Sequence, residues 1–188
     1  MVRVIAGEFK SRKLRTLDSR ATRPTSDRLK ETLFNLVQSR IADAAFLDCF
    51  AGSGSIGIEA LSRGASFVAF VESSLGAVQV IRQNLTSLGE DGSPQCQILD
   101  QKAQAALKSL ERTGRKFDIV FLDPPYDDAD QYPRVFEQLQ NGELLNDAAL
   151  VVAEHSKFLA LPAQVMHLER RRQVRQGDSV LSLFQFQA

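Results

Sequence analysis

Residues 46–57 read Phe-Leu-Asp-Cys-Phe-Ala-Gly-Ser-Gly-Ser-Ile-Gly, a short apolar run that leads into a glycine-rich loop. The run predicts a buried strand over residues 46–50, and the residues after the loop predict a helix from Ser55 to Arg63. The glycines have the spacing GxGxxG, and an acid, Glu72, follows twenty residues after the first of them. This order of strand, loop, helix and acid is typical of folds that bind an adenosine-containing ligand. The alternative is that the glycines only form a tight turn.

The rest of the chain continues the alternation of strands and helices. Further strands are expected at residues 67–71, 95–99, 118–122 and 149–153, and further helices at residues 75–88, 103–113 and 130–140. Short, almost continuously apolar strands are typical of a parallel sheet with helices on both faces. Two strand-like runs, at 165–174 and 179–186, are joined at Gln176-Gly177-Asp178 and predict an antiparallel hairpin. We therefore predict an α/β, Rossmann-like fold with a seven-stranded, mostly parallel sheet that ends in an antiparallel C-terminal hairpin.

The N-terminal segment is basic, although the net charge of the whole chain is zero. Residues 1–30 carry nine Lys or Arg side chains against three acidic ones, so the remainder of the chain is acidic. Alternating apolar residues predict a short basic β-hairpin with a turn near Gly7, and helical spacing predicts a helix from Ser26 or Asp27 to about Arg40. We expect residues 1–24 to be a basic extension that contacts nucleic-acid phosphates, and residues 25–188 to be one globular domain. A solvated basic tail is the alternative.

Asp48 distinguishes two candidate ligands for the glycine loop. A dinucleotide would place its pyrophosphate at the start of the helix, where a nearby carboxylate repels it. S-adenosylmethionine carries an ammonium group and a cationic sulfonium, which a carboxylate at the strand end attracts. We therefore expect S-adenosylmethionine, with Glu72 accepting hydrogen bonds from the ribose hydroxyls. The expected cofactor-binding residues are Asp48, Ala51, Gly52, Ser53, Gly54, Gly57 and Glu72.

The segment Asp-Ile-Val-Phe-Leu-Asp-Pro-Pro-Tyr at residues 118–126 is an apolar strand that ends in an acid, two prolines and an aromatic residue. Proline cannot continue a central strand, so the last four residues must leave the sheet at its carboxyl edge, where ligands of such folds bind. Asp123 and the Pro124 carbonyl can accept the two hydrogens of an exocyclic amino group, and Tyr126 offers a ring on which a base stacks. The expected catalytic residues, which orient the amine for methyl transfer, are Asp123, Pro124, Pro125 and Tyr126. A rigid loop without chemistry is the alternative, and adenine N6, cytosine N4 and guanine N2 all remain open as targets.

Together the two motifs resemble those of the class I S-adenosylmethionine-dependent amino-methyltransferases, and the resemblance implies their fold. Arg3-Val-Ile-Ala-Gly7, Lys10-Ser-Arg12-Lys-Leu14 and residues 23–35 resemble the RsmD family of small-subunit ribosomal RNA guanine-N2-methyltransferases, over nearly the whole chain. The resemblance implies methyl transfer to one guanine of 16S rRNA, guanine 966, on the small ribosomal subunit or its assembly intermediate. It also implies that the basic hairpin grips RNA, with Arg12, Lys13 and Arg23 as candidate contacts. For Arg23, contact with the methionine part of the cofactor and entry into the following helix are the alternatives. Lys102 is a departure, because many class I enzymes have an acid there that binds the adenine amino group.

Other features of the sequence bear on the class of protein. No apolar run reaches the length of about eighteen residues that spans a membrane, and the N-terminus lacks the apolar region of a signal peptide, so we expect a cytoplasmic monomer that does not contact membranes. Cys49 and Cys96 form no CxxC pair, and with only two histidines no metal site is expected. Three alternatives stay open: an amino-methyltransferase acting on adenine N6 or cytosine N4 of another RNA or of DNA, a nicotinamide-dependent oxidoreductase, and a non-catalytic RNA-binding assembly factor.

Overall fold

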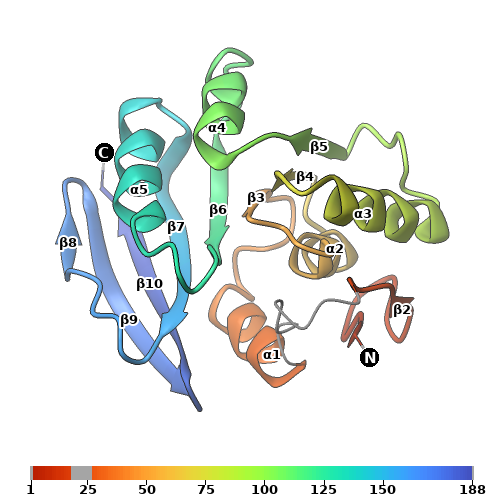
Figure 1. The fold of residues 1–188 in the computed structure, drawn as a ribbon, viewed down its shortest axis with the longest axis horizontal. Helices are drawn as coiled ribbons and strands as arrows, with labels where there is room; N and C mark the ends of the chain where they lie inside the picture. The colour runs from red at the N-terminus through yellow and green to blue at the C-terminus, as the bar shows by residue number, and fades with distance from the viewer. Residues whose placement is uncertain (1, 18–26, 188) are drawn as a thin grey trace.

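The computed structural model describes residues 2–17 and 27–187, in which strands and helices alternate as the sequence predicts (Figure 1). The helices are α1 Asp27–Leu36, α2 Ser55–Ser62, α3 Leu75–Leu88, α4 Ala103–Glu111 and α5 Gln131–Asn141. The strands are β1 Val2–Arg3, β2 Lys13–Leu14, β3 Ala45–Cys49, β4 Phe67–Glu72, β5 Cys96–Asp100, β6 Phe117–Leu122, β7 Leu145–Ser156, β8 Gln164–Val165, β9 Leu168–Gln176 and β10 Ser179–Phe186.

The main sheet has the strand order β5-β4-β3-β6-β7-β10-β9-β8. Strands β3 to β7 pair in parallel, whereas β10, β9 and β8 pair with antiparallel neighbours. The chain runs outward from β3 to β5 on one side and from β6 to β7 on the other, so the order reverses between β3 and β6. Ligands of open α/β sheets bind at such a reversal, outside the carboxyl ends of the strands.

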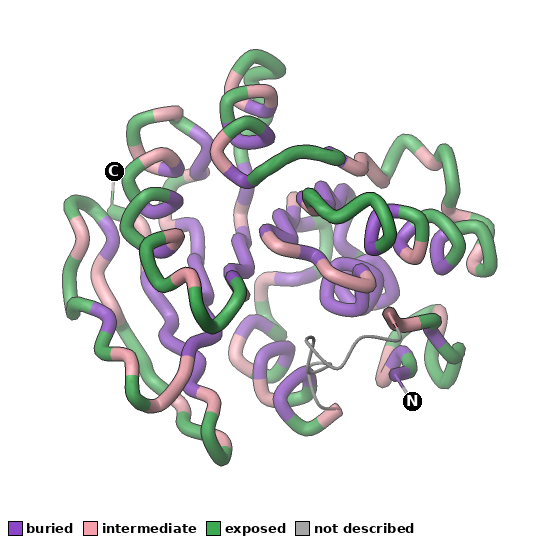
Figure 2. Tube along the Cα trace, viewed as in Figure 1, coloured by how far each residue is buried: buried purple, intermediate pink, exposed green. Residues whose placement is uncertain are grey.

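Helices cover both faces of the sheet and make the two halves of the core. Helices α1, α2 and α3 lie on one face with the N-terminal hairpin, and α4 and α5 lie on the other (Figure 1). Phe46 of β3 packs in the first half and its neighbour Leu47 in the second, because successive side chains of a strand point to opposite faces. Figure 2 shows the buried residues following the central strands and the inward sides of the helices. The strands are therefore apolar on both faces, as predicted.

The number of strands and the end of the first helix differ from the sequence-based predictions. The main sheet has eight strands where seven were predicted, because the run at 165–174 is broken at Met166. Met166 adopts a left-handed backbone conformation, with φ of 50°, and folds β8 back so that Val165 pairs with Leu168. Helix α1 ends at Leu36 rather than near Arg40, and the chain continues in a turn in which the Arg40 N–H donates to the Val37 carbonyl at 2.9 Å.

The N-terminal hairpin packs on α2 and shares its core. Val2, Val4 and Leu14 are buried with the side chains of α1 and α2. Gly7 approaches α2 so closely that a β-carbon would lie 1.7 Å from the Ser62 carbonyl oxygen, which only glycine avoids. The expected boundary between residues 24 and 25 lies outside the described residues. Among the residues that are described, no helix is long and apolar enough to cross a membrane.

Candidate active site

The glycine loop connects β3 to α2 and is held in place by buried hydrogen bonds. Asp48, near the end of β3, is 2% exposed, and its Oδ2 accepts a hydrogen bond from the Gly57 N–H at 2.8 Å. Gly54 has a left-handed conformation, with φ of 77°, and begins the helix. At Gly57 a β-carbon would lie 2.3 Å from Cε1 of Phe70, a fully buried ring of β4. These glycines thus serve the turn and the close packing of helix on strand, two of the roles that this motif assigns to them.

Glu72 ends β4 beside the loop. Its Oε2 accepts from the Gly52 N–H at 2.9 Å, and its Oε1 accepts from the Ser74 N–H at 2.8 Å. Each carboxylate oxygen can accept a second hydrogen bond, so both remain able to bind a hydroxyl. Glu72 therefore orients the loop and also presents acceptors to a ligand, which is the arrangement expected of a ribose-binding acid.

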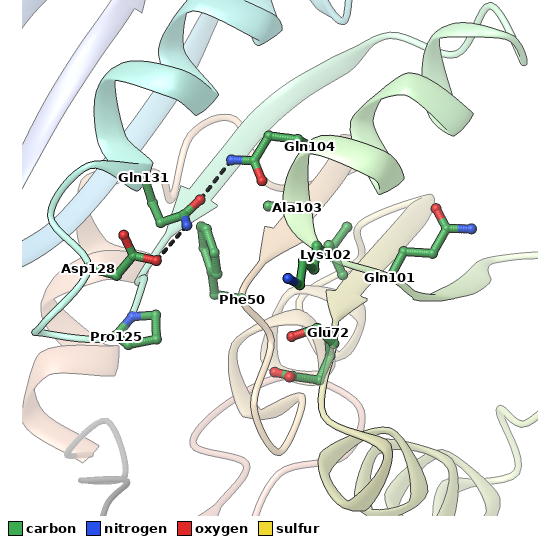
Figure 3. A pocket seen from close by; sticks show the side chains of 11 residues that line it. Phe50, Glu72, Gln101, Lys102, Ala103, Gln104, Pro125, Asp128 and Gln131 are labelled. Atoms are coloured by element: carbon green, nitrogen blue, oxygen red, sulfur yellow. Dashed lines mark hydrogen bonds between the residues drawn. The ribbon is translucent and has the colours of Figure 1, made fainter.

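A cleft of about 200 Å³ opens next to Glu72 (Figure 3). Gln131 crosses one side of it, accepting from Gln104 Nε2 at 2.7 Å and donating to Asp128 Oδ2 at 2.6 Å. Phe50, with a left-handed φ of 73°, and Lys102 contribute further walls. The complete lining is Phe50, Val71, Glu72, Ser73, Gln101, Lys102, Ala103, Gln104, Pro125, Asp128 and Gln131.

Several of these cleft residues were not predicted from the sequence. Phe50 was expected to end the strand, but the chain turns there, and its N–H donates to the Val71 carbonyl at 3.1 Å. Gln104 and Gln131 are on α4 and α5, and no motif marks them; only the packing of α4 beside α5 brings them together. Lys102, at the start of α4, does line the cleft in place of the usual acid.

The Asp-Pro-Pro-Tyr segment leaves β6 at the same edge of the sheet. The Asp128 N–H donates to the Pro125 carbonyl at 2.9 Å, which closes the segment into a turn. Pro124 is buried, whereas Pro125 is exposed and lines the cleft. Tyr126 is 61% exposed, and its hydroxyl lies 3.4 Å from Ser179 Oγ. The segment therefore contributes Pro125 to the wall of the cleft and an exposed aromatic ring, Tyr126, beside it.

Acidic side chains gather at this edge of the sheet, and the pKa values of Asp123 and Asp48 are raised there. Burial, reinforced by Glu154 and Asp48, raises the pKa of Asp123 well above its usual value. Burial also raises the pKa of Asp48 to about 7, although the Gly57 hydrogen bond opposes this and Glu72 adds to it. A cationic ligand or one rich in N–H donors would relieve this electrostatic cost.

Asn84 of α3 links the basic hairpin to the glycine loop and was also missed from the sequence. Its amide donates to the Ser53 carbonyl at 3.0 Å and to the Arg15 carbonyl at 3.1 Å, while its Oδ1 accepts from the Arg15 N–H at 2.8 Å. An asparagine inside a helix carries no sequence signal for such a role.

The predicted RNA contacts lie on this hairpin as far as the structure describes them. Arg12 donates to the Ser87 carbonyl at 2.8 Å, and Lys13 is exposed on β2. Arg23 lies outside the described residues. The two described side chains are therefore on the surface, next to α3.

Comparison with known proteins identifies the family. The sequence model of a family described as "Conserved hypothetical protein 95" matches residues 2–185. Ribosomal RNA small subunit methyltransferase D of Escherichia coli is 34% identical over 187 residues, which cover 100% of this chain and 91% of that protein. This chain belongs to the RsmD family.

Two further comparisons agree with membership of the RsmD family. The protein of the same name from Haemophilus influenzae is 45% identical over 125 residues, covering 66% of this chain and 64% of that protein. The solved structure of yhhF from Escherichia coli matches with a TM-score of 0.85 and 32% identity, covering 100% of this chain and 98% of that one. The α/β architecture, with its parallel strands and antiparallel end, is thus that of a solved relative.

Proposed function

We propose that this chain is an S-adenosylmethionine-dependent methyltransferase of small-subunit ribosomal RNA, and that its target is the N2 amino group of guanine 966 in 16S rRNA. The names of the Escherichia coli and Haemophilus influenzae relatives support the reaction and the class of RNA. The observation that carries the proposal is the position of residues 123–126, which leave β6 beside the cleft next to Glu72. A base held by this segment lies next to a cofactor held in the cleft.

The residues of the cleft fit S-adenosylmethionine. Glu72 offers acceptors to ribose hydroxyls, and the apolar ring of Phe50 provides a surface for the adenine. The buried acid Asp48 favours a cation, and S-adenosylmethionine brings both a sulfonium and an ammonium group. When bound, this cofactor supplies an electrophilic methyl group.

The reacting amine needs orientation more than activation by a strong base. Its lone pair is delocalised into the ring, and hydrogen bonds from the amino group to Asp123 and to the Pro124 carbonyl favour a geometry that frees the lone pair for in-line attack. Tyr126, exposed at the edge of the site, stacks on the base after it has been flipped out of its helix. Asp123, whose pKa is raised by burial and by its acidic neighbours, is suited to take the proton that the nitrogen loses.

The hairpin at residues 1–24 is proposed to hold the RNA outside the catalytic site. It presents Arg12 and Lys13 on the surface, and Asn84 ties it to the cofactor loop. Phosphate contacts of this kind fix the position of RNA without reading its sequence.

The test is transfer of labelled methyl groups from S-adenosylmethionine to small ribosomal subunits that lack modifications, followed by nucleoside analysis. The expected product is N2-methylguanosine at one site. Asp123→Ala should abolish transfer while cofactor binding, measured by calorimetry, stays within about threefold; Glu72→Ala should weaken cofactor binding at least tenfold. Methylated adenine or cytosine would overturn the guanine assignment, and full activity of Asp123→Ala would overturn the catalytic one.

A further inference from the structure

Glu154 lies beside Asp123 on the neighbouring strand, and the catalytic segment as predicted from the sequence does not include it. In the register of β6 and β7, Phe121 pairs with Val152 and Leu122 with Ala153. Phe121 and Val152 both pack in the half of the core that faces α1 and α2. Side chains two residues further along point the same way, so Asp123 and Glu154 both face that side at the carboxyl edge.

Glu154 is also connected to the aromatic residue of the segment. Its side chain is buried, with 5% of the residue exposed, and its Oε1 accepts a hydrogen bond from Ser179 Oγ at 3.1 Å. Since a hydroxyl has one hydrogen and Ser179 donates it to Glu154, Tyr126 is the donor in the 3.4 Å contact between the Tyr126 hydroxyl and Ser179 Oγ. Tyr126, Ser179 and Glu154 thus form one chain of contacts beside Asp123.

Two neighbouring carboxyl groups suit a ligand that presents two neighbouring N–H donors. Electrostatic interaction with Glu154 contributes to the raised pKa of Asp123, which places the two groups within each other's influence. A metal ion is not the evident partner, since within the described ranges no group of three or more His, Cys, Asp or Glu is arranged to hold one. Guanine has the required edge, because its N1–H adjoins its N2 amino group. Adenine and cytosine instead have an acceptor nitrogen next to the amino group.

We propose that Glu154 is a specificity-determining residue that accepts the N1–H of the target guanine while Asp123 and the Pro124 carbonyl hold its N2 amino group. This inference rests on the proposed function and names the feature of the base that the site reads. Glu154 selects guanine because an unprotonated ring nitrogen at the same position would place two acceptors against each other, a mismatch that hydrogen-bonding sites reject strongly.

The experiment compares two target bases in the full-length enzyme. RNA substrates carry at the target position either guanine or 2-aminopurine, which keeps the N2 amino group but has an unprotonated N1. The wild-type enzyme should prefer guanine by roughly tenfold or more in kcat/KM. In Glu154→Gln the amide offers a donor in place of one acceptor, so the preference should shrink at least fivefold or reverse. The O6 atom that 2-aminopurine lacks affects both enzymes alike and cancels in this comparison.

Glu137→Gln, an exposed change on α5, is the matched control and should keep the wild-type preference. The dissociation constant for S-adenosylmethionine should be the same in all three proteins, which separates base reading from a structural effect. An unchanged preference in a folded Glu154→Gln enzyme overturns the inference but leaves the methyltransferase intact. If Glu154→Gln does not fold, the inference is overturned by a wild-type enzyme that methylates guanine and 2-aminopurine equally well. A wild-type enzyme that methylates only adenine or cytosine overturns both the inference and the proposed function.

Discussion

The backbone N–H of Gly57 donates a hydrogen bond of 2.8 Å to Oδ2 of Asp48, and so joins the end of β3 to the first turn of α2. This bond favours the ionised carboxylate, whereas burial favours the protonated acid. Burial is the larger effect and raises the pKa of Asp48 to about 7. The acid that begins the cofactor motif therefore lowers the stability of the ligand-free protein when it is ionised.

The first prediction concerns Asp48→Asn and pH. Between about pH 4 and pH 7 the folded protein holds a proton on Asp48 that the unfolded chain has released, so the contribution of this group to the free energy of unfolding falls as pH rises. Asparagine does not titrate and keeps an acceptor for Gly57. Without cofactor, the variant should match the wild type near pH 4 and exceed it at pH 8 by up to roughly 4 kcal/mol.

Urea unfolding at a series of pH values measures this difference. Because the charge also attracts the cationic cofactor, Asp48→Asn should bind S-adenosylmethionine more weakly at pH 8 despite its greater stability. A constant stability difference between pH 4 and pH 8 would show that Asp48 has an ordinary pKa.

The second prediction compares two glycines at the starts of helices. Alanine at Gly57 would press a β-carbon against the buried ring of Phe70, and overpacking of this kind costs about 1–3 kcal/mol. Alanine at Gly76 would meet only ordinary contact, 3.7 Å from Leu17 Cδ2, and should add about 0.5–1 kcal/mol through its helix propensity. Chemical unfolding of both variants checks this, and equal effects would mean that Phe70 moves aside at little cost.

The most predictable parts of this fold were those that depend only on residues close together in the sequence. The loop between β3 and α2, the acid at the end of β4 and the proline turn after β6 each depend on local residues, so their positions follow from the chain itself. Helix α3 was predicted with its observed ends, and in the structure Gly89, with φ of 81°, closes it in a left-handed cap.

The parts that sequence analysis missed depend on pairing between distant segments. Glu154 becomes a neighbour of Asp123 only through the register of β6 with β7, and Ser179 reaches it only because β10 returns next to β7. Gln104 and Gln131 meet by the packing of two helices that no motif relates. None of these contacts has a signature in the local sequence.

The third prediction concerns Glu59, the buried acid that fixes the hairpin to α2. Its carboxylate accepts from the N–H groups of Ile5 at 2.8 Å and Ala6 at 3.0 Å, and it lies 3.3 Å from Lys30 Nζ and 2.9 Å from Arg63 Nε. Glu59→Gln would leave the buried Lys30 without its counter-charge, a change that costs about 3–5 kcal/mol. Amide hydrogen exchange at Ile5 and Ala6 should accelerate as the hairpin loosens.

The double variant Glu59→Gln/Lys30→Met tests the cause of this loss. It removes the buried cation along with its partner and should recover part of the lost stability. If it is no more stable than the single variant, the hydrogen bonds to the hairpin, rather than the ion pair, are what Glu59 provides.

The fourth prediction separates RNA contact from general electrostatic attraction. Lys13 is exposed on β2 of the hairpin, whereas Lys108 is exposed on α4, which packs on the opposite face of the sheet. Lys13→Glu should weaken binding to ribosomal RNA several-fold and reduce the slope of log K against log salt by about one, because each phosphate contact releases about one counterion. Lys108→Glu changes the net charge equally and should leave the slope as it is.

Cofactor affinity provides the control. Asn84 ties the hairpin to the cofactor loop through the backbone groups of Arg15 and Ser53, and not through Lys13, so cofactor affinity should be unchanged in both variants. Equal weakening by both substitutions would mean that the RNA senses the charge of the whole protein and that the hairpin makes no particular contact.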